Sequence, residues 1–234
     1  EALAYLPTYQ PNDSTLKPPQ PLGRAAAGLP ATGVVLACFC RSDKLDPVLF
    51  SSWMRVLQRV PTACLWLYIL DTGTRERLRN AARSCGVAAQ RIIFADRQPK
   101  EDHLRRLAAA DLVLDTRLYN GHTTTSDALL AGVPVITLMG SHFPSRVSAS
   151  LLLAQGLTSC ITHSLEEYEE RVVALASDQR ALMHLKESAR AAYHHGNLFD
   201  TARFVIHLEN VLRQMIEVQV KGANPRTLTS VSVG

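Results

Sequence analysis

The segment from Asn120 to Asp127 contains residue types that could bind a phosphate group. It reads Asn-Gly-His-Thr-Thr-Thr-Ser-Asp, in which the glycine permits a tight turn and the hydroxyl residues can open a helix. The unpaired N–H groups and the dipole of a helix N-terminus attract anions, and His122, Thr123 and Thr124 could add hydrogen-bond donors. The Asp127 carboxylate could accept hydrogen bonds from sugar hydroxyls. Ordinary helix capping by Thr and Asp explains the same pattern, so both interpretations remain open.

A second group of candidates is cationic. Lys100, His103 and Arg106 recur at a spacing of three, which would place them on roughly one face of a helix. Pro99, followed by two acidic residues, is typical of a helix start. A cationic face at the carboxyl end of a strand suits a nucleotide, whereas a solvated charged face is the alternative.

Two more cations, Arg41 and Lys44, follow the first long apolar run of the sequence. Lys44 could act as a point-charge partner for phosphate, although the pair alone is weak evidence. The sequence lacks the zinc-protease HExxH, the GxSxG elbow, the Walker P-loop and the dinucleotide GxGxxG motif. The remaining histidines are isolated, apart from one pair at a predicted helix end, so we expect no metal site.

Composition excludes several classes of protein. The net charge of +4 is mild and the few aromatic residues are not interleaved with basic runs, which argues against a nucleic-acid groove. The five cysteines are irregularly spaced and include no CxxC pair, so we expect neither zinc nor disulfides, and a cytoplasmic location. No apolar run approaches the roughly 20 residues of a membrane span. The chain opens on Glu1 in a polar, Pro-containing stretch without a signal-peptide pattern. Because no initiator Met precedes this stretch, we expect the chain to begin inside a longer protein.

Buried strands and amphipathic helices alternate through most of the chain, with short links between them. Apolar runs predict strands at residues 34–40, 65–70, 91–95, 112–115 and 135–138. Helical spacing and end signals predict one helix that starts at Asp46-Pro47 and a second, after the strand at 65–70, that ends near residue 83. Further helices are predicted at about 99–109, 124–132, 145–155, 166–177, 179–193 and 201–220.

This alternation predicts an α/β fold, a Rossmann-like parallel sheet with right-handed crossovers and helices on both faces. Ligands of such folds bind beyond the carboxyl ends of the strands, which selects the loops that start near Arg41, Asp96 and Thr116. The expected organisation is an extended connector at residues 1–30, the Rossmann-like domain at 31–197, a closing helix at 198–221 and a flexible tail at 222–234.

Several motifs that occur in order resemble the signature of the O-GlcNAc transferases. They are Asn-Gly-His-Thr-Thr at 120–124, Asp127, Ala-Gly-Val-Pro at 131–134 and Ser-Arg-Val-Ser-Ala-Ser at 145–150. The segments 59–67, 91–103 and the one that begins at Phe199 are similar too, and the opening residues 5–10 resemble bacterial members. The resemblance implies the C-terminal half of a GT-B glycosyltransferase, which transfers GlcNAc from UDP-GlcNAc to Ser or Thr of proteins with inversion and without a metal or other cofactor.

The resemblance also implies roles for the candidate residues around the diphosphate. Lys44 would neutralise the diphosphate leaving group, and His122, Thr123 and Thr124 would bind the diphosphate at the helix start, which makes Lys44 and His122 the catalytic candidates of this chain. Asp127 would hold the ribose.

Further roles follow for the base and the sugar. Gln98 would meet the uracil through its backbone, and His103 would stack near the base. Lys100 and Arg106 would line the nucleotide site, and Arg41 would contact the sugar or the phosphates.

Members of the family also have an N-terminal catalytic lobe and tetratricopeptide repeats, so these and an acceptor protein are the expected partners. No general base can be named from this chain. An apolar stripe on the last helix, formed by residues 204, 208, 211, 212 and 215, is expected to pack partly toward that lobe and to form an exposed patch without it. The alternatives are another GT-B nucleotide-sugar enzyme, such as an O-fucosyltransferase or a UDP-GlcNAc epimerase, and a non-catalytic nucleotide-binding scaffold.

Overall fold

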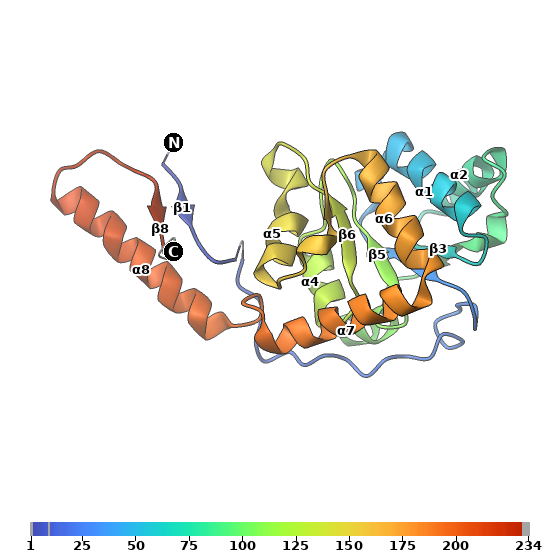
Figure 1. The fold of residues 1–234 in the computed structure, drawn as a ribbon, viewed down its shortest axis with the longest axis horizontal. Helices are drawn as coiled ribbons and strands as arrows, with labels where there is room; N and C mark the ends of the chain where they lie inside the picture. The colour runs from blue at the N-terminus through green and yellow to red at the C-terminus, as the bar shows by residue number, and fades with distance from the viewer. Residues whose placement is uncertain (1, 9, 231–234) are drawn as a thin grey trace.

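A parallel sheet of six strands forms the centre of the molecule (Figure 1). The computed structural model describes residues 2–8 and 10–230. The strand order is β4-β3-β2-β5-β6-β7, and each pair of neighbours is parallel. The strands are β2 (Val35–Cys38), β3 (Cys64–Tyr68), β4 (Ile92–Ala95), β5 (Leu112–Leu114), β6 (Val135–Leu138) and β7 (Ile161–Thr162).

The first half of the sheet runs outward from β2 to β4, and the second half runs outward in the opposite direction from β5 to β7. The direction therefore reverses between β2 and β5, whose pairing joins Leu36 to Leu112 and Ala37 to Val113. In doubly wound folds a ligand crevice opens outside the carboxyl ends of the strands at such a reversal. The structure confirms the predicted Rossmann-like fold.

Helices cover the sheet and follow the predicted alternation. Helix α1 packs against α6, α4 packs against α3 and α5, and α7 contacts both α4 and α6 (Figure 1). The helices are α1 (Pro47–Arg59), α2 (Thr72–Ser84), α3 (Lys100–Leu107), α4 (Thr123–Leu130), α5 (Val147–Ala154), α6 (Leu165–Ser177), α7 (Gln179–His195) and α8 (Thr201–Val220).

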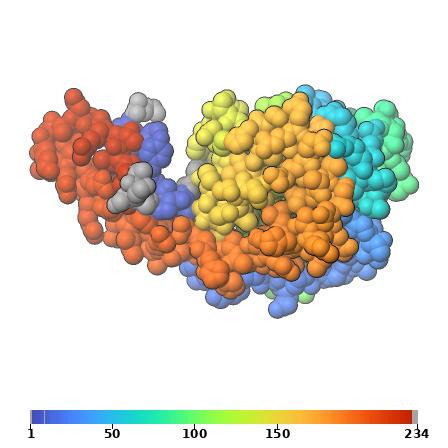
Figure 2. All heavy atoms as spheres, in the orientation of Figure 1, coloured from blue at the N-terminus to red at the C-terminus, as the bar shows by residue number. Residues whose placement is uncertain are grey.

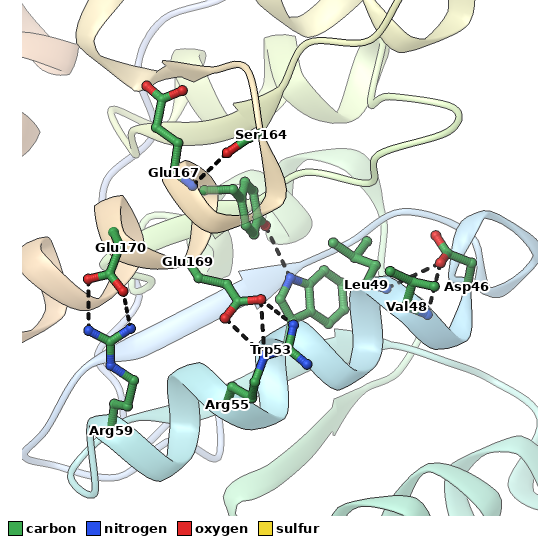
Figure 3. A network of polar contacts seen from close by, with 11 residues as sticks. Asp46, Val48, Leu49, Trp53, Arg55, Arg59, Ser164, Glu167, Glu169 and Glu170 are labelled. Atoms are coloured by element: carbon green, nitrogen blue, oxygen red, sulfur yellow. Dashed lines mark hydrogen bonds and ion pairs between the residues drawn. The ribbon is translucent and has the colours of Figure 1, made fainter.

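The contact between α1 and α6 combines buried and exposed polar groups (Figure 3). The buried Trp53 indole donates to the Tyr168 hydroxyl over 3.1 Å. Toward the solvent, Arg55 forms an ion pair with Glu169, and Arg59 forms one with Glu170. Exposed pairs of this kind contribute little free energy, so the apolar contact beneath them is the main stabilising term.

Some local expectations need correction. The helix predicted to start at Ser145 begins at Val147, because Phe143–Ser145 forms a separate 3-10 turn, η3. The two-residue strand β7 was not predicted, because so short a strand leaves no periodic pattern. The segment expected to be a flexible tail contains strand β8 (Leu228–Thr229), which pairs in parallel with β1 (Ala4–Tyr5) in the predicted connector. Tyr9 and residues 1 and 231–234 of these segments lie outside the described residues.

Helix α8 projects from the main body, with β1 and β8 beside it (Figures 1 and 2). Of the predicted stripe, Val211 is buried, Phe204 and Leu208 are partly buried, and Leu212 and Met215 are exposed. The expected exposed apolar patch is therefore present, and it also includes Val205, Ile206, Ile216 and Val220.

Asp111 joins three segments at the amino ends of the strands. Its carboxylate accepts a hydrogen bond from Val35 N at 2.8 Å, pairs with Lys186 of α7 at 2.9 Å and also pairs with Arg24. Arg24 donates in turn to the carbonyl of Gly33 at 2.8 Å. Gly33 has φ +88, and a Cβ there would lie 2.1 Å from the Thr62 carbonyl oxygen, so only glycine fits.

We predict that Asp111→Ala lowers the free energy of unfolding by about 3 kcal/mol, because it leaves two cations and a buried N–H without their acceptor. Urea unfolding followed by circular dichroism measures the change. Glu209→Ala is the control, since it removes only an exposed pair with Arg213 and should change stability by less than about 0.5 kcal/mol. Equal stability of the two variants would contradict this role of Asp111.

Candidate functional site

A cavity of 290 Å³ opens at the carboxyl-end edge of the sheet, next to β2, β3 and β4. The predicted residues Gln98, Lys100, His103 and Arg106 all line it, so the structure brings this group together. The complete lining consists of Phe39, Tyr68, Arg97, Gln98, Lys100, His103 and Arg106.

Aromatic and guanidinium planes form the inner wall of this cavity. The Phe39 ring meets the His103 ring edge-on at a centroid distance of 5.1 Å, and the Arg106 guanidinium lies 5.2 Å from the Phe39 centroid. Arg106 is only 4% exposed, and its Nη1 donates to the carbonyl of Asp96 at 2.7 Å. Its Nε is buried and has no hydrogen-bond partner among the described residues. A flat, partly apolar ligand with hydrogen-bonding edges suits these walls.

His103 is neutral at pH 7. Burial, together with the nearby charges of Arg106 and Lys100, lowers the pKa of this imidazole to about 4. A neutral ring can stack against a base and either donate or accept a hydrogen bond.

The loop between β5 and α4 is organised by a carboxylate that the sequence did not single out as a site residue. Asp115, at the end of β5, accepts from the backbone N–H groups of Thr116 at 2.9 Å and Gly121 at 2.6 Å. It also accepts from the Thr137 hydroxyl of β6 at 2.6 Å. Complete burial raises the pKa of Asp115, and these donors oppose that rise by stabilising the charged form.

The same loop returns close to its own helix. A Cβ on Gly121 would lie 2.5 Å from the hydroxyls of both Thr124 and Thr125, so the approach requires glycine. Asn120 N donates to the Pro144 carbonyl at 2.8 Å, and the Ser148 hydroxyl donates to the Gly121 carbonyl at 2.9 Å. These contacts fix the N-terminus of α4 at the edge of the sheet beside β2.

Lys44 reaches this loop from the end of the 3-10 turn η1 (Ser42–Lys44) that follows β2. Its Nζ donates to the Asn120 carbonyl at 2.8 Å and lies 3.8 Å from the centroid of the Tyr119 ring. His122, the N-cap residue of α4, meets the Tyr119 ring edge-on at 5.3 Å. Partial burial, with a smaller contribution from the charge of Lys44, lowers the pKa of His122.

Asp127 forms an ion pair with Lys100, which links the helix start to the cavity. Burial raises the pKa of Asp127, and the hydrogen bond and charge of Lys100 oppose the rise. Thr123 is exposed at the helix start, while the Thr124 hydroxyl lies 3.5 Å from the Cys40 sulfur. Arg41 is turned away from this group, because it pairs with Asp43 and its side chain is 79% exposed.

The sequence analysis therefore missed four residues that line the cavity or organise the loop before α4. Tyr68 ends strand β3, and Phe39 and Asp115 directly follow strands β2 and β5. A polar or aromatic residue at that position was the signal that the sequence offered. Tyr119 carried no signal, because its contact with Lys44 joins residues 75 positions apart.

Within residues 2–8 and 10–230, no three His, Cys, Asp or Glu side chains gather as metal ligands would. Over the same residues, no helix combines the length and the hydropathy needed to span a bilayer.

A larger cavity of 740 Å³ lies at the opposite edge, around Asp111, Lys186 and the start of β2. Three of its ionic groups already pair with one another, because Arg24 and Lys186 both form ion pairs with Asp111. It holds none of the predicted site residues, so the smaller cavity beside α4 is the candidate site.

The model of glycosyl transferase family 41 matches residues 19–208 of this chain. A probable UDP-N-acetylglucosamine–peptide N-acetylglucosaminyltransferase of Arabidopsis thaliana is 41% identical over 218 residues, which cover 93% of this chain and 22% of the relative. The UDP-N-acetylglucosamine–peptide N-acetylglucosaminyltransferase of Caenorhabditis elegans is 33% identical over 192 residues, which cover 82% and 17%. The chain thus spans less than a quarter of either relative.

A solved structure of an O-GlcNAc transferase from Thermobaculum terrenum superposes with a TM-score of 0.77 at 30% identity. The superposition covers 94% of this chain and 39% of that one. The fold of nearly the whole chain therefore occurs within a larger glycosyltransferase.

We predict that Asp115→Asn weakens UDP binding by at least about tenfold and lowers the free energy of unfolding by about 2 kcal/mol, because an amide cannot accept from all three donors. Calorimetry with UDP and thermal unfolding measure the two effects. The matched control is Asp178→Asn at the N-cap of α7, where Asn and Asp serve almost equally well. UDP binding like that of the unmodified chain would show that the Asp115 carboxylate does not shape the site.

Proposed function

Because the chain belongs to glycosyl transferase family 41, we propose that it is the nucleotide-sugar-binding lobe of a protein O-GlcNAc transferase. One observation carries the proposal. The cavity walled by Phe39, His103 and Arg106 adjoins the N-terminus of α4 at the same edge of the sheet, with Lys44 beside that N-terminus. A nucleoside and its diphosphate need two such adjacent sites, one flat and partly apolar and one electropositive.

The uracil of UDP-GlcNAc occupies the cavity in this proposal. The Gln98 backbone contacts the base edge and His103 stacks near it, while Lys100 and Arg106 line the pocket. Asp127 then accepts hydrogen bonds from the ribose hydroxyls beside its ion pair with Lys100. The buried N–H of Arg106 that lacks a protein acceptor supports a polar ligand here.

The diphosphate lies against the first turn of α4. The backbone N–H groups of that turn, the hydroxyls of Thr123 and Thr124 and the His122 ring are its donors. Lys44 approaches from the other side, and among the described residues no carboxylate forms an ion pair with it. Its charge is therefore not neutralised by the protein. Arg41 reaches this region only by leaving its pair with Asp43.

The reaction breaks the bond between the anomeric carbon and the diphosphate oxygen, and UDP departs with the electron pair. The hydroxyl oxygen of a Ser or Thr forms the new bond from the opposite side, which inverts the anomeric carbon. The proton of that hydroxyl passes to a general base, which the residues of this chain do not identify. Negative charge grows on the departing diphosphate, so Lys44, His122 and the α4 dipole lower the barrier electrostatically, without a metal.

Acceptor binding is assigned to an N-terminal catalytic lobe and tetratricopeptide repeats of the same protein, and the cytoplasm is the proposed location. The coverage of only 39% of the Thermobaculum terrenum chain supports a second lobe. So does the exposed apolar face of α8, which suits a neighbouring domain. This chain alone lacks one wall of a two-lobe active site, so its catalysis must be tested in the full-length protein.

We predict that the chain binds UDP more tightly than GDP or ADP, because the proposed contacts of Gln98 and His103 are made to uracil. Isothermal titration calorimetry with the three nucleotides measures the preference. His103→Ala should weaken UDP binding by about tenfold, the loss of roughly one stacking or hydrogen-bonding contact, and His163→Ala, which changes an exposed loop residue, should not. Equal or tighter binding of GDP would contradict the uridine assignment and favour a GDP-sugar enzyme.

We predict that Lys44→Ala in the full-length protein lowers kcat about a hundredfold and changes KM for UDP-GlcNAc much less, because the leaving-group charge peaks late in the reaction. Removal of one such stabilising donor costs about 3 kcal/mol. Transfer from radiolabelled UDP-GlcNAc to acceptor protein gives both constants, with Lys17→Ala on the exposed connector as the control. An unchanged kcat would remove Lys44 from the mechanism, and UDP binding without any transfer by the full-length protein would favour a scaffold function.

A further inference from the structure

Tyr119 stands between the two groups that are assigned to the diphosphate. Its ring centroid lies 3.8 Å from the Nζ of Lys44. The same ring meets the His122 imidazole edge-on, with centroids 5.3 Å apart and planes at 72°. One side chain therefore contacts both donors, and its exposed fraction of 48% shows that it lies at the mouth of the site rather than in the core.

The backbone of Tyr119 is held in place independently of its ring. Its carbonyl accepts a hydrogen bond from the Thr116 hydroxyl at 2.6 Å. The following residue, Asn120, donates from Nδ2 to the Thr116 carbonyl at 2.7 Å and from its backbone N to the Pro144 carbonyl at 2.8 Å. A change of the Tyr119 side chain should consequently leave the loop intact.

Lys44 depends on such a contact for its position. Its flexible four-carbon stem ends in an ammonium group that contacts the Asn120 carbonyl and the Tyr119 ring. The carbonyl restrains one N–H, and the ring restrains the direction of the ammonium group by cation–π attraction. Neither contact carries a negative charge, so the full positive charge stays available to an anion, which would not be the case if a carboxylate held the lysine.

We propose that Tyr119 is a positioning residue that holds the Lys44 ammonium group, by cation–π contact, against the diphosphate leaving group. The inference rests on the proposed function, because it needs Lys44 to act on the leaving group. It adds a residue that acts through Lys44. An aromatic ring is required at position 119, while the hydroxyl of the tyrosine is not.

The test compares Tyr119→Phe, Tyr119→Leu, Lys44→Ala and the double variant Lys44→Ala/Tyr119→Leu in the full-length protein. Initial rates with UDP-GlcNAc and an acceptor protein give kcat and KM, and thermal unfolding verifies that each variant is folded. Tyr119→Phe keeps the ring and should stay within about twofold of the unmodified enzyme. Tyr119→Leu should lower kcat about tenfold, which corresponds to about 1.4 kcal/mol, with KM for UDP-GlcNAc changed less.

The double variant separates positioning from a general structural effect. If the ring acts through the lysine, the double variant should be no slower than Lys44→Ala alone. If the double variant is slower than Lys44→Ala, the proposed role of Tyr119 is overturned. The same holds if Tyr119→Leu is as fast as Tyr119→Phe while Lys44→Ala is impaired. Either result leaves the proposed role of Lys44 intact. A Lys44→Ala enzyme with normal kcat would overturn the proposed role of Lys44 and the role of Tyr119 with it.

Discussion

The buried carboxylate of Asp115 and its three donors determine where the candidate site can form. The donors come from the start of the loop, from Gly121 at its end and from Thr137 on the neighbouring strand β6. One side chain therefore closes the loop onto the sheet, and the closed loop sets the start of α4. This loop contains the carbonyl that holds Lys44 and the ring of Tyr119, and the end of α4 that we propose to bind the diphosphate follows it directly. The order of the strands adds the second requirement, because it places β2, and with it Lys44, next to β5.

The cations at this edge of the sheet differ in how they are balanced. Lys100 pairs with Asp127, and Arg106 lies buried under Phe39 with its head against a carbonyl. These two groups shape the walls of the cavity. Lys44 is held by a carbonyl and an aromatic ring, which restrain it without cancelling its charge. Under the proposed function, this arrangement separates recognition of the nucleoside from stabilisation of the charge that develops when the sugar leaves.

The sequence was sufficient for the fold and for most of the residues that line the candidate site, for reasons that particular residues illustrate. Continuous apolar strands and capped helices such as the one that starts at Asp46 are local signals, and the structure contains them. The spacing of Lys100, His103 and Arg106 placed three side chains around one cavity for the same reason. The roles of these residues remain predictions. The sequence did not reveal the contact between Lys44 and Tyr119 or the pairing of β1 with β8, because both join segments that are distant in the chain. It also did not reveal that Arg41 pairs with Asp43, because periodicity does not determine which nearby partner a side chain selects.

Amide chemical shifts of the isotopically labelled chain, recorded during titration with UDP, test the central claim most directly, because they locate the ligand without reliance on catalysis. We expect the largest shifts at residues 97–103 and 121–127, at the carboxyl-end edge of the sheet, and smaller ones near Lys44. The cavity around Asp111 and Lys186, at the opposite edge, should show none. Shifts that cluster around Asp111 and Lys186, with residues 121–127 unaffected, would contradict the account.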